Sequence, residues 1–297
     1  MKHRKKRRGS DFILYVFIRL LIAPPGWCYR IMALPIISLI SSGWLTERLS
    51  IIQRIRNNLG IVFPEMDRKK KKDLLKKVLW QTVISTYESG HLYRAAWLKK
   101  VVTVEGLAYL DEALKQKKGV VVLSAHLGSF TLILAYLRMY GYPIRNIGRD
   151  PDNPYLARYF EKVRRKAKIV HIPKNPLTVS TRESLRWLKE GNILSLPADQ
   201  HTSHGIAVPF FNHNVRTPTG PVVFARRLDC AVLPVSIVRR DKKHVIRIEP
   251  PFNLVRTDNP EEDIRQNTIL FNQVIERWVR SDPDQWFGWF TRRFRGL

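Results

Sequence analysis

A histidine stands where a buried strand is expected to give way to a helix. Val120 to Leu123 is an unbroken apolar run, β-branched at three of its four positions, which is typical of a strand buried on both faces of a parallel sheet. His126 follows this run, and apolar residues from Leu132 to Leu137 then recur at helical spacing. Ligands collect at the carboxyl ends of strands in open α/β sheets, and imidazole exchanges protons near neutral pH. We therefore interpret His126 as a functional histidine.

An acid follows a second apolar run. Asp199 comes directly after Ile193 to Ala198, so it stands at the end of another expected strand and can face the same cleft as His126. Asp199, His201, His204 and His213 together offer ligand types that zinc accepts. Their spacing matches no familiar zinc signature, so a metal site is only a minor alternative.

Several motifs carry a family resemblance. Residues 124–131 (Ser-Ala-His-Leu-Gly-Ser-Phe-Thr) resemble a His-x4-Asp/Glu motif, and residues 199–221 contain Asp-Gln, then Val-Pro-Phe-Phe, then Thr and Gly-Pro in a matching order. Residues 283–294 resemble the ending Pro-x-Gln-Trp…Trp-x-His-Arg-Arg-Trp. On these motifs the chain is similar to the bacterial lipid A (lauroyl/myristoyl) acyltransferase family of the lysophospholipid acyltransferase superfamily. The resemblance covers roughly residues 50–297.

The resemblance implies a catalytic role for His126 as a general base on an acceptor hydroxyl, oriented by an acid. Thr131 stands where the family has that acid. A threonine hydroxyl can accept the imidazole N–H, but it adds no negative charge, so we expect Asp199 to supply the missing carboxylate. A glutamate introduced at position 131 is expected to be tolerated or activating.

The resemblance also implies substrate-binding residues. These are Arg149, Asn153, Arg164, Gln200, Phe210, Phe211 and Arg292. The arginines are suited to anionic groups, because a guanidinium grips phosphate through two parallel hydrogen bonds. Alternatives remain open from the residues alone: Arg164 on the solvated face of a helix, Phe210 and Phe211 in the core, and Arg292 as an anchor of the C-terminal segment.

The expected fold is α/β, with a central, mostly parallel sheet flanked by helices. Strands are predicted at 101–105, 120–123, 144–147, 169–172, 193–197, 232–238 and 245–248. Helices are predicted within 47–98 and at 107–114, 155–167, 182–189, 222–227 and 268–279. Asp152 or Asn153 is predicted to cap the helix that Pro154 opens.

The N-terminal segment, residues 1–48, differs from the acyltransferase-like domain expected over 49–297. It begins with a basic run, Lys2 to Arg8, which is either a solvated tail or an anchor to acidic lipids. Two apolar runs follow, at residues 12–24 and 31–45, and each is shorter than a straightforward membrane span. We expect a membrane-embedded hairpin or an interfacial pair, with a single tilted span as the alternative.

Composition restricts the partners. The formal charge is +27, from 52 Lys and Arg against 25 Asp and Glu, which indicates anionic partners. Charge is the only argument for nucleic acid, since no zinc signature, helix-turn-helix or aromatic RNA motif is present, and we expect no nucleic-acid partner. Cys28 and Cys230 lie far apart and fit a reducing compartment.

The sequence thus predicts an acyltransferase on the cytoplasmic face of the bacterial inner membrane. A fatty acyl group is expected to pass from an acyl carrier protein or coenzyme A to a hydroxyl or amine of a membrane glycolipid of the lipid A type, or of a related amphiphile. No cofactor and no metal are expected. Because Thr131 replaces the motif acid, a catalytically degenerate lipid-binding member of the same family is the alternative.

Overall fold

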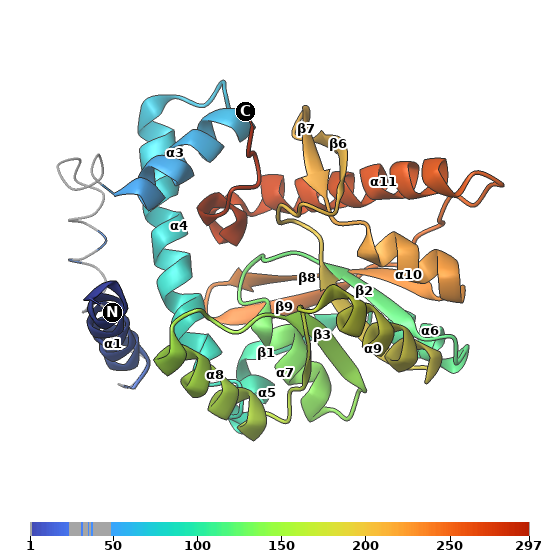
Figure 1. Ribbon diagram of the computed structural model, residues 1–297, viewed down its shortest axis with the longest axis horizontal. Helices are drawn as coiled ribbons and strands as arrows, with labels where there is room; N and C mark the ends of the chain where they lie inside the picture. The colour runs from blue at the N-terminus through green and yellow to red at the C-terminus, as the bar shows by residue number, and fades with distance from the viewer. Residues whose placement is uncertain (1, 24–30, 32–34, 36, 38–48, 297) are drawn as a thin grey trace.

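The central element of the structure is a seven-stranded sheet between two layers of helices (Figure 1). The computed structural model describes residues 2–23, 31, 35, 37 and 49–296. The strand order is β1-β9-β8-β2-β5-β3-β4, and all neighbours are parallel except β8 and β9. The expected mostly parallel α/β sheet is confirmed. The strands are β1 (Val102–Glu105), β2 (Val120–Ser124), β3 (Ile144–Gly148), β4 (His171–Pro173), β5 (Ile193–Pro197), β8 (Ala231–Arg240) and β9 (Lys243–Ile248).

The middle strand β2 is buried along its whole length, as the apolar run predicted. Successive side chains of a strand point to opposite faces of the sheet. Val121 and Leu123 therefore join the hydrophobic core on one face, while Val120 and Val122 join the core on the other. Helices cover both faces, so no position of β2 is left for a polar side chain until the strand ends.

The helices divide between the two faces. Core residues on one face come from α3 (Ser50–Val62), α4 (Arg68–Ser89), α9 (Leu177–Lys189), α10 (Gly220–Leu228) and α11 (Pro260–Ser281). Those on the other come from α5 (Ala95–Val101), α6 (Leu107–Lys115), α7 (Thr131–Met139) and α8 (Pro154–Lys166). A hairpin of β6 (Ile206–Phe210) and β7 (His213–Thr217) contacts α11, and two short 3-10 turns, η1 (Pro283–Gln285) and η2 (Phe287–Phe290), follow α11.

Helix boundaries follow local capping chemistry. The Asn153 side chain accepts hydrogen bonds from the backbone amides of Tyr155 and Leu156 at 3.0 and 3.1 Å, so Asn153 is the N-cap of α8 and the capping prediction is confirmed. The C-terminal helix α11 begins at Pro260 instead of Thr268. Asn259 caps it and three acidic residues occupy its first turn, so a capped, acidic N-terminal part extends the predicted amphipathic helix.

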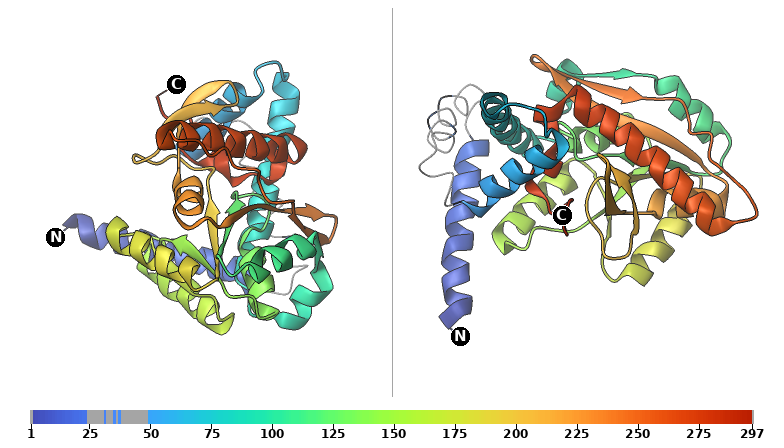
Figure 2. Two further views of the ribbon diagram at one scale, coloured as in Figure 1. Left: turned by 90° about the vertical axis from the view of Figure 1, so that its right-hand side faces the viewer. Right: turned by 90° about the horizontal axis from the view of Figure 1, so that it is seen from above.

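The basic N-terminal run forms the start of a helix, α1 (Lys2–Ile22), that lies beside α8 and α4 (Figures 1 and 2). Leu21 of α1 packs against Ile84 of α4. Among the helices that the structure describes, none combines the length and the apolar character needed to cross a bilayer. The second apolar run, 31–45, lies almost wholly outside the described residues, and so does the membrane hairpin that we expect from it.

Candidate active site

The register of the sheet brings His126 and Asp199 together. Ser124 of β2 lies opposite Pro197 of the parallel strand β5, so the residues two positions further along each chain emerge side by side at the carboxyl edge. His126 Nδ1 lies 2.7 Å from Asp199 Oδ1, and the His126 backbone N–H donates to Asp199 Oδ2 at 3.1 Å. The acid is therefore held at the same strand ends as the histidine.

The Asp199 carboxylate is fully buried and receives a third hydrogen bond. The indole N–H of Trp286 donates to Asp199 Oδ2 at 2.9 Å. Burial by itself raises the pKa of Asp199, but the charge and hydrogen bonds of His126 and the bond from Trp286 outweigh it and hold this pKa below its usual value. Asp199 is therefore a carboxylate at neutral pH.

The position of the proton on His126 follows from this contact. An ionised carboxylate only accepts hydrogen bonds, so Nδ1 of His126 carries the hydrogen that Asp199 receives. This leaves the lone pair of Nε2 free to act as a base. The His126 side chain is 19% exposed, and its ring packs edge-on against Phe130 with centroids 4.7 Å apart. Asp199 thus orients the His126 ring through Nδ1, while the exposed part of the ring remains accessible to solvent or substrate.

The segment after α11 closes the loop that carries His126. Leu127 and Trp286 form an isolated antiparallel bridge, and the Phe287 amide donates to the His126 carbonyl at 2.8 Å. The Gly128 amide donates to the Gln285 carbonyl, also at 2.8 Å. Gly128 has φ +55°, and a Cβ atom there would lie 2.5 Å from the Ile237 carbonyl oxygen, so this close approach requires glycine.

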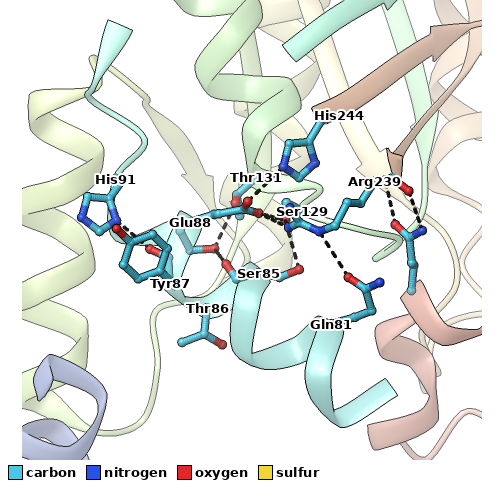
Figure 3. Close-up of polar contacts among 12 residues, drawn as sticks. Gln81, Ser85, Thr86, Tyr87, Glu88, His91, Ser129, Thr131, Arg239 and His244 are labelled. Atoms are coloured by element: carbon cyan, nitrogen blue, oxygen red, sulfur yellow. Dashed lines mark hydrogen bonds and ion pairs between the residues drawn. The ribbon is translucent and has the colours of Figure 1, made fainter. Parts of the chain in front are cut away.

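Thr131 lies at the start of α7 and faces α4 (Figure 3). Its hydroxyl lies 3.1 Å from the Ser89 hydroxyl, within hydrogen-bonding distance. The sequence allowed the Thr131 hydroxyl to accept the imidazole N–H and led us to expect the carboxylate from Asp199; in the structure, Asp199 contacts Nδ1 of His126. Of the three predicted catalytic residues, the structure brings together His126 and Asp199 and leaves Thr131 in a contact between helices.

A second buried carboxylate, Glu88 of α4, contacts Ser129 of the same loop (Figure 3). Glu88 Oε2 accepts hydrogen bonds from the Ser129 hydroxyl and from Arg239 Nη2, the latter at 2.5 Å, and Oε1 lies 3.0 Å from His244 Nε2. We call Glu88, Ser129, Arg239 and His244 the Glu88 cluster. Burial opposes ionisation of Glu88, but His244 and Arg239 prevail and lower its pKa to about 2.

The Glu88 cluster fixes the backbone beyond His126. Ser129 belongs to the loop itself, and the Arg239 amide donates to Gln285 Oε1 at 2.7 Å, which ties the end of β8 to the segment that bridges Leu127. Sequence reasoning missed this cluster. One signal was available: Glu88 continues the buried positions Leu74, Val78 and Ile84 of α4 at helical spacing. Nothing in the sequence paired it with Arg239 or His244.

The predicted arginines on the other side of the sheet edge are paired with acids. Arg164 Nη2 lies 2.5 Å from Asp150 Oδ1, and the Arg164 side chain is half-buried. Arg149 Nη2 lies 2.9 Å from Asp152 Oδ2, and both side chains are exposed. An anionic substrate group would share these arginines with the two carboxylates, or would displace the carboxylates from them.

The remaining predicted binding residues are scattered. Phe210 and Phe211 are buried, and both rings contact Trp286, the residue that donates to Asp199. They therefore belong to the core, which is the alternative that the sequence left open. The Asn153 side chain caps α8 and donates to the Asp11 carbonyl at 2.7 Å. Gln200 is half-buried next to Asp199, while Arg292 is exposed. In the described part of the chain, no three His, Cys, Asp or Glu side chains gather as a metal site requires.

Comparison with known proteins shows the family of the chain. The family model for the bacterial lipid A biosynthesis acyltransferases matches residues 4–296. The chain is 25% identical over 249 residues to a lipid A biosynthesis palmitoleoyltransferase of Escherichia coli K12, covering 81% of this chain and 77% of the relative. A lipid A biosynthesis acyltransferase of Shigella flexneri matches with the same identity and coverage. The chain therefore belongs to the bacterial lipid A biosynthesis acyltransferase family, and it is an acyltransferase.

Proposed function

We propose that the protein transfers a fatty acyl group from the thioester of an acyl carrier protein or coenzyme A to a hydroxyl or amine of a lipid A type glycolipid. We place this reaction at the cytoplasmic face of the bacterial inner membrane. The observation that carries the proposal is the 2.7 Å contact between His126 Nδ1 and the buried Asp199 carboxylate, which leaves Nε2 of a half-buried imidazole available as a base.

The chemistry needs one proton to travel in a cycle. His126 Nε2 takes the proton of the acceptor hydroxyl while the oxygen of that hydroxyl attacks the thioester carbonyl carbon. The carbon–oxygen bond forms, the carbon–sulfur bond breaks, and the departing thiolate recovers the proton from the imidazolium. Asp199 stays ionised throughout and stabilises the imidazolium that exists between these two transfers.

Stabilisation of the intermediate's oxyanion falls to the start of α7. The Gly128 amide is already engaged with the Gln285 carbonyl, and the Leu132 and Ile133 amides donate to the Ser129 and Phe130 carbonyls, so we assign this role to the remaining amides where α7 begins, those of Ser129, Phe130 and Thr131. Arg149 and Arg164 are the residues that we assign to anionic parts of the substrates, which would compete with Asp152 and Asp150 for them.

The degenerate alternative rested on Thr131, which carries no charge. A carboxylate from β5 at 2.7 Å from His126 Nδ1 supports the catalytic proposal over that alternative. The formal charge of +27 supports acidic partners, both the acyl carrier protein and the anionic membrane surface.

The test uses purified full-length protein with acyl carrier protein thioester and a lipid A precursor, and it follows the product by mass spectrometry. His126→Ala is expected to abolish acyl transfer. His204→Ala, which removes an exposed histidine, is the matched control and should retain full activity. Full activity of His126→Ala would refute the mechanism. A parallel lipid profile of cells with and without the gene identifies the acceptor, since that lipid loses one acyl chain.

A further inference from the structure

A cavity of about 560 Å³ lies between α1 and α8, and His126 is not among its lining residues. It is lined by Tyr15, Arg19, Tyr93, Tyr155, Arg158, Tyr159, Lys162, Val163 and Lys166. Its volume falls in the range of small-ligand sites. The catalytic proposal makes no use of it.

The charge of this cavity has one sign. Four of its lining side chains are cationic, and the lining includes no Asp or Glu. Arg19 lies over the Tyr159 ring at 4.6 Å and Lys166 over the Tyr93 ring at 4.9 Å, so aromatic faces hold two of the cations. Arg158 and Lys162 stand one helical turn apart on α8 and are exposed. The site therefore favours an anion.

The walls of the cavity are held together by aromatic contacts between α1 and α8. Phe12 and Tyr15 of α1 contact the Tyr155 ring with centroids 5.4 and 5.8 Å apart. Asn153 at the start of α8 also donates to the Asp11 carbonyl of α1 at 2.7 Å. Phe12, Tyr15 and Arg19 follow one another at helical spacing, so they lie on one face of α1, and this face borders the cavity.

The neighbouring side of α1 is apolar and exposed, and Phe12 and Val16, which are 49% and 36% exposed, lie between it and the residues that line the cavity. Ile13, Phe17 and Leu20 are 70%, 48% and 54% exposed, and their spacing puts them on one stripe of the helix. An exposed stripe of this kind marks a surface that meets a membrane or another apolar phase. A cavity that adjoins such a stripe on the same helix would lie at the depth of lipid headgroups.

We propose that this cavity binds the phosphate of an anionic phospholipid headgroup. Arg158 and Lys162 would supply charged hydrogen bonds to the phosphate oxygens, and the hydroxyls of the lining tyrosines would supply further donors. The acyl chains of the same lipid would lie along Ile13, Phe17 and Leu20. The site anchors the enzyme to a membrane lipid and is independent of acyl transfer.

The test measures flotation of full-length protein with two kinds of vesicle: phosphatidylcholine alone, and equal parts of phosphatidylcholine and phosphatidylglycerol. The double variant Arg158→Ala/Lys162→Ala is compared with Arg182→Ala/Lys189→Ala, which removes the same residue types from the exposed face of α9. The cavity variant should lose about tenfold or more of its partition onto the anionic vesicles, while the α9 control should lose less than about threefold. Equal losses would overturn the proposal in favour of diffuse charge.

Three further arms complete the test. The swap Arg158→Lys/Lys162→Arg should restore binding, which shows that the alanine variant did not fail by misfolding. Inorganic phosphate should not release the wild-type protein from the anionic vesicles at an ionic strength at which sodium chloride leaves it bound; selective release by phosphate would identify a site for free phosphate instead. If the alanine variant floats like wild type but no longer binds acyl carrier protein, the cavity serves a protein partner and the lipid proposal is wrong.

Discussion

Two buried carboxylates contact the loop that carries His126, and they hold their partners differently. Asp199 contacts His126, which is 19% exposed, and the neutral indole of Trp286. Glu88 contacts His244, which is 0% exposed, and the permanent charge of Arg239. The first carboxylate therefore leaves an imidazole nitrogen within reach of solvent or substrate, whereas the second is neutralised inside the protein.

The difference shows that the surroundings of a histidine–carboxylate pair decide whether its imidazole can act as a base. A base needs an orienting acid and an accessible nitrogen, and the pair of Asp199 and His126 meets both conditions. Arginine beside Glu88 fixes one charge state over the whole physiological range. We therefore propose that Asp199 orients His126 and stabilises its imidazolium, whereas Glu88 holds the loop, and each of the following predictions tests that division.

The largest effect is expected from Asp199→Asn. An amide in place of the carboxylate removes the charge that supports the imidazolium and favours the wrong tautomer of His126. By analogy with other acid–histidine pairs, the turnover number should fall by about 10⁴-fold, or about 5 kcal/mol in activation free energy. Steady-state acyl transfer measures this, with circular dichroism to verify folding. Near-normal turnover would mean that His126 works without Asp199.

Glu88→Gln should act chiefly on stability. It leaves Arg239 and His244 without their buried anion, and breaking such a pair costs about 3–5 kcal/mol. Urea unfolding measures the change, and Glu65→Gln, at an exposed position, is the matched control. A Glu88→Gln protein as stable as wild type would show that the Glu88 carboxylate does not stabilise the fold.

Acid should reproduce part of that loss in the unmutated protein. The folded pKa of Glu88 is about 2 and its ordinary value is 4.5. Because the folded pKa is depressed, the ionised carboxylate contributes its full stability above pH 4.5, and this contribution is lost as the pH falls toward 2. The full contribution is on the order of 3 kcal/mol. The stability difference between wild type and Glu88→Gln should shrink over this window; a constant difference would contradict the assignment.

Trp286→Phe should give a smaller, catalytic effect. It removes one hydrogen bond to Asp199 but keeps an aromatic ring, so turnover should fall about tenfold, or about 1.4 kcal/mol. Trp289→Phe is a close control, because the Trp289 indole is equally buried but donates to the Pro283 carbonyl. Comparable losses in turnover from both variants would indicate packing rather than the contact with Asp199.

The smallest effects are expected at Thr131. Thr131→Ala removes a hydrogen bond to Ser89, worth about 1 kcal/mol of stability, and should change turnover less than about threefold. The structure also changes the expectation for Thr131→Glu, which the sequence predicted to be tolerated or activating. Because position 131 faces Ser89, next to Glu88 in α4, a second carboxylate there should lower the melting temperature without raising turnover. An activated Thr131→Glu enzyme would show that the loop can rearrange toward His126.

The fold and the central pair of the site were predictable because they depend on local patterns. Val120 to Leu123 and Ile193 to Pro197 are apolar runs of strand length, and parallel pairing of any two such strands puts the next polar residues side by side. The Glu88 cluster was not predictable in this way. Glu88 comes from α4, Ser129 from the loop that follows β2, Arg239 from β8 and His244 from β9. Only the packing of α4 against the sheet edge brings these residues together. The contact of Thr131 was not predictable for the same reason, since its hydroxyl lies against Ser89 of α4.

The contact between Trp286 and Asp199 ties catalysis to the order of protein synthesis. The ribosome makes His126 and Asp199 well before it makes residues 283–290. Until that segment folds back, Asp199 lacks its indole donor and the loop after His126 lacks the bridge between Leu127 and Trp286. A partly synthesised chain therefore carries His126 and Asp199 without the contacts that complete the site, and we expect full activity only after residues 283–290 have docked.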